Sequence, residues 1–173
     1  MILVRVERDE LFSVQRMLNA TNAQIERAGT RAMNKTLKWI GSNARHEIAQ
    51  KHDIPLKSLK GRVRLSNAKP GKARAIAWFG IGDMRAIFAG ARQNARGVQA
   101  RSHFFQSAFI ATPYGHLNVF KRKGKERFPI IVQKIPLEHA EGILERVAQH
   151  APDRLRSIYV QELNYELNVR GVG

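Results

Sequence analysis

The sequence contains no cysteine, so disulfides, thiolate nucleophiles and thiolate metal sites are excluded. It also lacks any apolar run near the roughly 18 residues that a membrane-spanning helix requires. The first ten residues have no long apolar core of the kind a signal peptide needs. We therefore expect a soluble protein, made in the cytoplasm and without a membrane contact.

Acidic residues are scarce in the middle of the chain. Residues 57–127 contain sixteen lysines and arginines but two acids, and no acid lies between Asp83 and Glu126. This segment accounts for +14 of the net charge of +16. Such an imbalance favours contact with nucleic acid or an acidic protein surface over a merely solvated face. A metal-dependent nuclease is disfavoured, because it holds its ions with clustered carboxylates.

No recognisable catalytic or cofactor motif appears. His46 and His52 superficially suggest a zinc-protease helix, but that motif places its two histidines four residues apart on one helical face. Gly80-Ile81-Gly82 lacks the third glycine and the following helix of a phosphate-binding loop. We expect no catalytic, cofactor-binding or metal-binding residues, and therefore no enzyme.

The remaining pattern predicts an α+β protein, with a small antiparallel sheet and a basic-tipped meander packed against a long N-terminal helix and C-terminal helices. With 43% hydrophobic residues and no linker or repeat, we expect a single domain over residues 1–173. The predicted elements are a strand at 1–6, helices at 7–19 and 20–51, a helical turn at 55–59, paired strands at 62–66 and 73–79, helices at 137–149 and 153–168, and a frayed tail at 171–173. Thr21 is the expected N-cap of the long helix. We expect the strand at 73–79 to alternate, with Ala73, Ala75, Ala77 and Phe79 on one face. The long helix has an apolar stripe at helical spacing, formed by Ile25, Ala28, Ala32, Met33, Thr36, Leu37, Ile40, Ala44 and Ile48.

The stretch from Ser107 to Pro136 organises the second half of the chain. Two apolar runs, at 108–111 and 117–120, flank a Pro-Tyr-Gly turn, and a third run at 129–132 follows a basic tip at 121–127. This order predicts an antiparallel meander of three strands. The preceding residues 89–103 are small, polar and basic without a clear period, so we expect a mobile loop there.

Basic side chains of the loop and the tip are the candidate contact residues for DNA or a protein partner. They are Arg92, Arg96 and Arg101 in the loop, and Lys121, Arg122, Lys123, Lys125 and Arg127 in the tip. Tyr114, Phe120 and Phe128 border the tip at strand positions, where core packing is expected more than base stacking. Without a recognition helix or zinc finger, contact with nucleic acid would be to the backbone and independent of sequence.

The order of several short motifs resembles a known family. A helix containing Ala32-Met33-Asn34-Lys35 precedes Ile54-Pro55-Leu56-Lys57 and Arg62-Val63-Arg64-Leu65. After the basic segment come three further motifs: Ala108-Phe109-Ile110, Gly115-His116-Leu117-Asn118-Val119-Phe120, and Phe128-Pro129-Ile130-Ile131 with Lys134-Ile135-Pro136. Over about residues 25–150 the chain resembles the minor tail protein Z family of tailed bacteriophages and prophages, also described as tail completion proteins.

The resemblance implies a structural virion protein at the head-proximal end of a long tail, near the neck where head and tail join. It implies a homo-oligomeric ring, commonly of six subunits, with the tail terminator and other neck or tail-tube proteins as partners and DNA passing through the channel. The family brings no catalytic residues. The alternative, from charge alone, is a sequence-independent nucleic-acid-binding protein that acts through residues 57–127.

Overall fold

The computed structural model describes residues 3–6, 21–113 and 115–169, and its internal contacts divide the chain into two compact units. The first unit comprises residues 1–45, 63–80 and 141–173, and the second comprises 46–62 and 81–140. The expectation of one domain over 1–173 stays a prediction. The predicted helix at 7–19 and the predicted tail at 171–173 lie outside the described residues.

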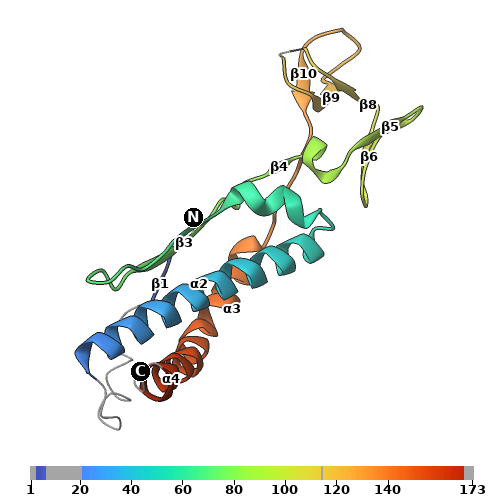
Figure 1. Ribbon diagram of the computed structural model, residues 1–173. Coiled ribbons are helices and arrows are strands. Elements are labelled where there is room, and N and C mark those ends of the chain that lie inside the picture. Colours follow the sequence, from blue (N-terminus) through green and yellow to red (C-terminus); the bar gives the residue numbers. More distant parts are fainter. Residues whose placement is uncertain (1–2, 7–20, 114, 170–173) are drawn as a thin grey trace. The chain divides into compact units, whose positions relative to one another are not determined.

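Helix α2, Asn22–Lys51, is the longest element, and its residues up to Arg45 belong to the first unit (Figure 1). The Thr21 hydroxyl accepts a hydrogen bond from the Gln24 amide at 3.3 Å, and the Gln24 side chain accepts one from the Thr21 amide at 2.9 Å. This reciprocal capping box satisfies two backbone donors that the first turn leaves open. The prediction of Thr21 as N-cap is confirmed.

One face of α2 is closed to solvent. Its buried residues recur at the helical spacing of the predicted stripe, and they are Ala28, Ala32, Met33, Thr36, Leu37, Ile40, Ala44 and Ile48. Spacing of three and four residues places these side chains on one side of the helix. The predicted apolar stripe is therefore confirmed, apart from Ile25, which is half-buried.

A three-stranded antiparallel sheet of order β1-β3-β2 packs in the first unit. Its strands are β1 Leu3–Val6, β2 Val63–Ser66 and β3 Ala75–Phe79. The predicted strand pair is confirmed, and β3 buries alternate residues as expected. The Leu65 side chain lies 3.1 Å from where a Cβ on Gly41 would stand, so this glycine lets β2 approach α2 closely.

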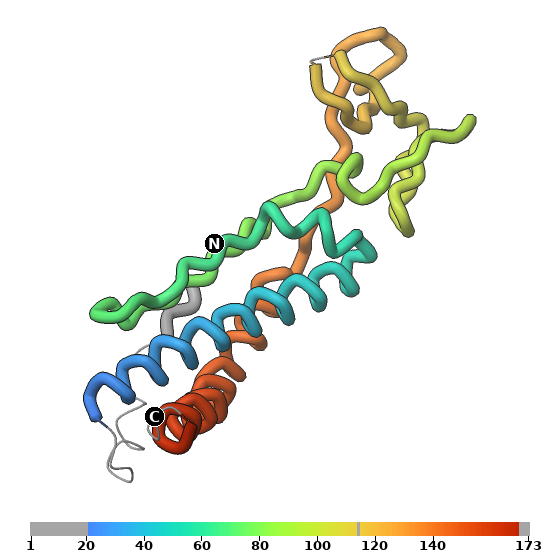
Figure 2. Tube along the Cα trace, in the orientation of Figure 1, coloured from blue at the N-terminus to red at the C-terminus, as the bar shows by residue number. Residues whose placement is uncertain are grey.

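Helices α3, Ala140–Gln149, and α4, Ala151–Asn168, follow near the C-terminus, with a proline in the first turn of α4. In the tube view, α4 (red) runs beside the N-terminal half of α2 (blue) (Figure 2). Their buried side chains include Ile143, Leu144 and Val147 of α3 and Leu155, Ile158, Tyr159 and Leu163 of α4. Both predicted helices are confirmed.

The second unit begins with the end of α2, from His46, followed by a 3-10 helix, η2 Leu56–Arg62, and continues through β4 Met84–Arg85 and η3 Ala86–Ala89. Strand β11, Lys134–Ile135, pairs with β4. Between them lies the predicted meander, formed by β8 Ala108–Ala111, β9 Asn118–Arg122 and β10 Ile130–Val132 in the order β10-β9-β8. The prediction of three antiparallel strands at 107–136 is confirmed.

The expectation of an irregular loop at 89–103 is wrong. This part of the chain builds a further three-stranded sheet from β5 Arg92–Asn94, β6 Gly97–Ala100 and β7 His103–Gln106. Residues of β5 are all exposed, whereas β6 is largely buried, so hydrophobic alternation is not visible over the segment. Whether the segment is mobile stays a prediction.

The α+β class is confirmed. The number of sheets and their placement differ from the expectation of one small sheet. The described residues form four small antiparallel sheets, and the sheet beside α2 is β1-β3-β2. The basic-tipped meander belongs to the second unit.

Candidate functional site

All eight candidate basic residues lie in the second unit, and all are exposed. They occupy three places: the β5–β6 hairpin, the turn between β6 and β7, and the end of β9 with the loop that leads to β10. This unit contains fourteen lysines and arginines against five acids, a net charge of +9. The candidates are thus surface cations on short, hydrogen-bonded strands and turns.

The β5–β6 hairpin presents Arg92 on its first strand and Arg96 in its turn. The Asn94 side-chain oxygen accepts hydrogen bonds from the Arg96 amide at 2.9 Å and the Gly97 amide at 3.0 Å. Gly97 adopts φ +155°, and a Cβ there would overlap the carbonyl oxygen of Phe105. Only glycine fits this close approach, so the turn that carries Arg96 has a fixed backbone.

Arg101 is the basic candidate with an acidic partner in its own unit. Its guanidinium lies 3.7 Å from an Asp53 oxygen, and the other Asp53 oxygen accepts a hydrogen bond from the Ser102 amide at 3.0 Å. Hydrogen bonds from the Ser102 side chain and backbone, together with the Arg101 charge, hold the pKa of Asp53 below its ordinary value. Arg101 is therefore partly neutralised within the chain.

The tip around β9 and β10 keeps its cations accessible. Lys121 and Arg122 end β9, and residues 121–129 are all exposed. The Arg122 guanidinium lies 5.8 Å from the Phe109 ring centre, and that of Arg127 lies 5.6 Å from the Phe128 ring centre. Stacking of this kind orients an arginine guanidinium without an ion pair to an acidic side chain.

The aromatic residues beside the tip have divided roles. Phe120 is 1% exposed and packs in the core, as predicted, but Phe128 is 55% exposed. The prediction of core packing for Phe128 is wrong, because this residue falls in the exposed loop before β10, outside the strand. Tyr114 lies outside the described residues.

The two three-stranded sheets of the second unit are joined. The Gln93 side chain accepts a hydrogen bond from the Ile110 amide at 2.8 Å, which ties β5 to β8. The strand that carries Arg92 therefore neighbours the meander that carries the tip. The proximity of these two groups of cations could not be predicted from the sequence, because no local pattern links residue 93 to residue 110.

Large exposed hydrophobic side chains on the same unit were missed by sequence reasoning. They are Leu56, Phe88, Phe104, Leu117, Phe128 and Ile131, which range from 37% to 55% exposed. Each sits in a short apolar run that resembles core when the sheet boundaries are unknown. The second unit thus exposes large hydrophobic side chains as well as cations.

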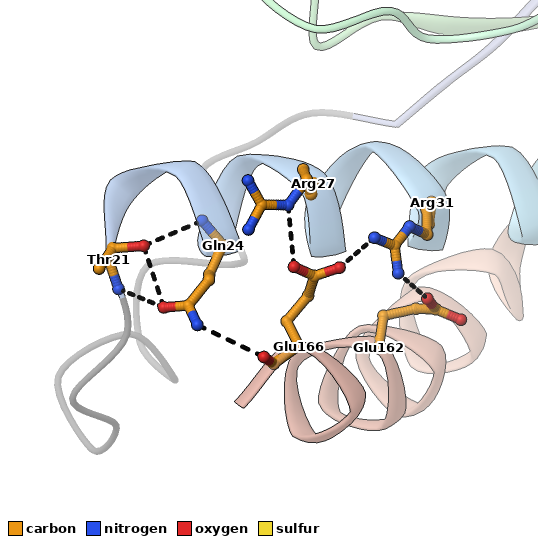
Figure 3. A network of polar contacts seen from close by, with 6 residues as sticks. All are labelled: Thr21, Gln24, Arg27, Arg31, Glu162 and Glu166. Carbon is orange, nitrogen blue, oxygen red and sulfur yellow. Dashed lines mark hydrogen bonds and ion pairs between the residues drawn. The ribbon is translucent and has the colours of Figure 1, made fainter. Parts of the chain in front are cut away.

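The densest cluster of charges was also missed, and it lies in the first unit between α2 and α4 (Figure 3). Glu166 is fully buried, and its two carboxylate oxygens meet Arg27, at 2.8 Å, and Arg31. Glu162 meets Arg31, at 3.4 Å, and Lys35. All four carboxylate oxygens have a cationic partner, so this cluster is built to hold two helices together.

The ranges 3–6, 21–113 and 115–169 contain no group of three His, Cys, Asp or Glu residues placed to hold a metal ion. Within those same ranges, no helix has both the length and the apolar character needed to cross a membrane.

Comparison with known proteins gives one match. The family model described as Prophage minor tail protein Z (GPZ) matches residues 13–170 of the 173. No curated protein and no solved structure matches the chain. The matched range covers all of the second unit and most of the first, and it extends the resemblance at 25–150 towards each end.

Proposed function

We propose that this chain, which belongs to the prophage minor tail protein Z family, completes the head-proximal end of a long phage tail as a subunit of a ring. The family supports a structural role in the tail and therefore a place in the virion. The finer assignment is to the neck, where the ring would contact the tail terminator and other tail-tube proteins. The chain would be made in the cytoplasm of the host bacterium before assembly.

The observation that carries this proposal is the surface of the second unit. Cations and large hydrophobic side chains are exposed there together, and residues 84–125 contain no acid to neutralise the cations. A monomer gains nothing from exposing Phe88, Phe104 and Phe128, whereas a protein that inserts between others buries them on assembly. The cations add selectivity for an acidic partner surface or for the phosphates of DNA in a channel.

Repetition around a ring strengthens both properties. Each copy brings the same eight basic residues, so six copies would form a dense collar of positive charge. Copies with net charge +16 repel one another, and complementary contacts between subunits must offset that repulsion.

The test is the mass of the protein in solution, measured alone and with the tail terminator of the same phage. We expect a defined oligomer, either alone or with the terminator, that joins terminator-capped tails. A double variant, Phe128→Ser with Ile131→Ser, should weaken joining about tenfold or more by removing two exposed anchors. Val160→Ser, at a similarly exposed position of the first unit, is the matched control. A protein that stays monomeric and never joins a tail overturns the proposal.

A second candidate function is sequence-independent binding of nucleic acid, favoured by the acid-free stretch at 84–125. Affinity for duplex DNA of arbitrary sequence should then fall steeply with salt, by roughly one power of salt concentration for each phosphate contact. Neutralising Lys121, Arg122, Lys123 and Lys125 to Gln should flatten that dependence. Absence of binding at low salt rules this candidate out.

A further inference from the structure

The first unit carries a second basic surface, on the outer face of its sheet. In β3, Ala75, Ala77 and Phe79 are buried, so the alternate residues Ile76 and Trp78 belong to the opposite face. Arg64 of β2 lies directly opposite Trp78 in the register, and its guanidinium is 5.2 Å from the Trp78 ring centre. This face therefore presents an aromatic ring with a cation held over it.

The hairpin that bears this face is rigidly attached and purely cationic. Residues 63–80 contain four cations and no acid, and all four are exposed: Arg64, Lys69, Lys72 and Arg74. The Asn34 side chain of α2 donates to the Ala68 carbonyl at 3.1 Å and accepts from the Ala68 amide at 2.8 Å. Glu26 accepts a hydrogen bond from the Gly71 amide at 2.6 Å. The cations are thus presented by a fixed scaffold.

An acidic counterpart lies on α3 of the same unit. Glu141 and Glu145 are one turn apart on the exposed side of this helix, whose other side is buried through Ile143, Leu144 and Val147. Neither carboxylate has an ion-pair partner among the described residues. Glu162 and Glu166 of α4, in contrast, form ion pairs with cations of α2.

These two surfaces lie on different sides of α2. Figure 1 shows the green hairpin on one side of α2, and α3 and α4 in orange and red on the other. Complementary surfaces on opposite sides of one unit can meet between neighbouring molecules, and head-to-tail contacts of this kind form a ring when the rotation between neighbours closes.

We propose that the Arg64–Trp78 face of one copy docks on the Glu141–Glu145 face of α3 in the next copy. This inference rests on the proposed ring and names the subunit contact within it. A second copy is the chosen occupant because charge complementarity is present in the chain itself. The pairing also supplies the attraction that a chain of net charge +16 needs to associate with itself.

The test is a charge swap in the full chain. Variant A carries Arg64→Glu and Arg74→Glu, and variant B carries Glu141→Lys and Glu145→Lys. Each variant alone juxtaposes like charges at every contact, so assembly should weaken on the order of 100-fold. Mixed in equal amounts, A and B restore opposite charges at both kinds of contact. The mixture should therefore form rings with an even number of alternating subunits, measurable by native mass spectrometry.

Controls separate folding and charge from the contact itself. A variant with all four changes in one chain should assemble alone, and unfolding midpoints of A and B identify any loss of fold. Lys51→Glu with Lys134→Glu matches the charge change of variant A at exposed positions of the second unit that lie outside the candidate contact residues, and should leave the subunit contact intact.

Each failure has its own meaning. If the wild-type chain forms a ring and variants A and B do so equally well, this contact is overturned while the proposed function stands. If A and B lose assembly but their mixture does not regain it, the pairing of these two faces is overturned. If variant A assembles normally but loses affinity for DNA, the occupant of the sheet face is nucleic acid and the inference is wrong. If the wild type never assembles, alone or with the terminator, the proposed function falls as well.

Discussion

Arginine and lysine side chains have opposite roles at two places in this molecule. One is the interface between α2 and α4, and the other is the basic surface of the second unit. At the interface, Arg27, Arg31 and Lys35 face the buried acids Glu162 and Glu166, and every carboxylate oxygen is matched. On the second unit, Arg101 is the candidate cation with an acidic partner among the described residues. The first arrangement neutralises charge by ion pairs within the chain, and the second leaves positive charge available for a binding partner.

This difference indicates where stability and where recognition reside. The free-energy cost of burying the Glu166 carboxylate is offset only by its ion pairs with Arg27 and Arg31. Loss of a member of this cluster should therefore lower the stability of the first unit. Exposed cations contribute little to the folded state and can be lost without unfolding. Substitutions at the two places should therefore separate stability from assembly, with effects on stability that decrease from the buried interface to the exposed tip.

Removing the buried acid should have the largest effect on stability. Glu166→Ala leaves Arg27 and Arg31 facing each other without a counter-charge and opens a gap beneath them. Because both arginines reach solvent, we expect a loss at the lower end of the range for broken buried pairs, about 3 kcal/mol. Urea unfolding followed by tryptophan fluorescence measures it, since Trp39 and Trp78 both belong to the first unit.

Glu126→Ala removes a fully accessible acid of the basic tip and is the control for that experiment. It should change the free energy of unfolding by no more than about 0.5 kcal/mol. Equal losses in the two variants would show that the interface is not what stabilises the first unit.

The second prediction concerns the turn that carries Arg96. Gly97→Ala places a Cβ against the Phe105 carbonyl at a φ that other residues rarely adopt, so β6 and β7 must separate. We expect a cost of about 2 kcal/mol and faster amide exchange over residues 97–106. Gly124→Ala is the matched control, because no atom lies within 4 Å of its added Cβ. Unchanged exchange in Gly97→Ala would contradict the tight turn.

Sequence patterns were sufficient for elements whose signals are local. The N-cap at Thr21, the alternation of β3 and the stripe of α2 each occupy a few consecutive turns or residues. The α2–α4 charge cluster could not be found this way, because residues 27 and 166 meet only after the chain has folded. Glu162 and Glu166 look like surface residues until arginines from another helix are placed above them.

The second unit was harder to predict for a related reason. Its strands are two to five residues long, and β5 has no buried side chain, so neither period nor burial is visible in the sequence at 92–94. The signal that was available is the Asn94-Ala95-Arg96-Gly97 turn, whose first and last residues favour a hairpin. The meander was predictable because its apolar runs and turn residues are distinct.

The third prediction is a pH dependence centred on Glu166. Burial raises its pKa, but hydrogen bonds and charge from Arg27 and Arg31 outweigh burial and bring the pKa below the ordinary 4.5. A carboxyl group with a lowered folded pKa stabilises the protein above its unfolded pKa, and that contribution is lost as pH falls through the folded value. The stability difference between wild type and Glu166→Gln should therefore shrink as pH is lowered from about 5 towards 3. A difference that stays constant over this range contradicts the assignment.

The smallest effect on stability is expected where the largest effect on recognition is proposed. Changing Lys121, Arg122, Lys123 and Lys125 to Gln removes four positive charges from the exposed end of β9 and its loop. These side chains have no acidic partner among the described residues, so the unfolding free energy should move by less than about 1 kcal/mol. We expect the change to be a gain, measured by urea unfolding, since repulsion within the acid-free stretch is relieved. A large loss of stability would show that the tip is part of the folded core, and the contrast between the two units would fail at that point.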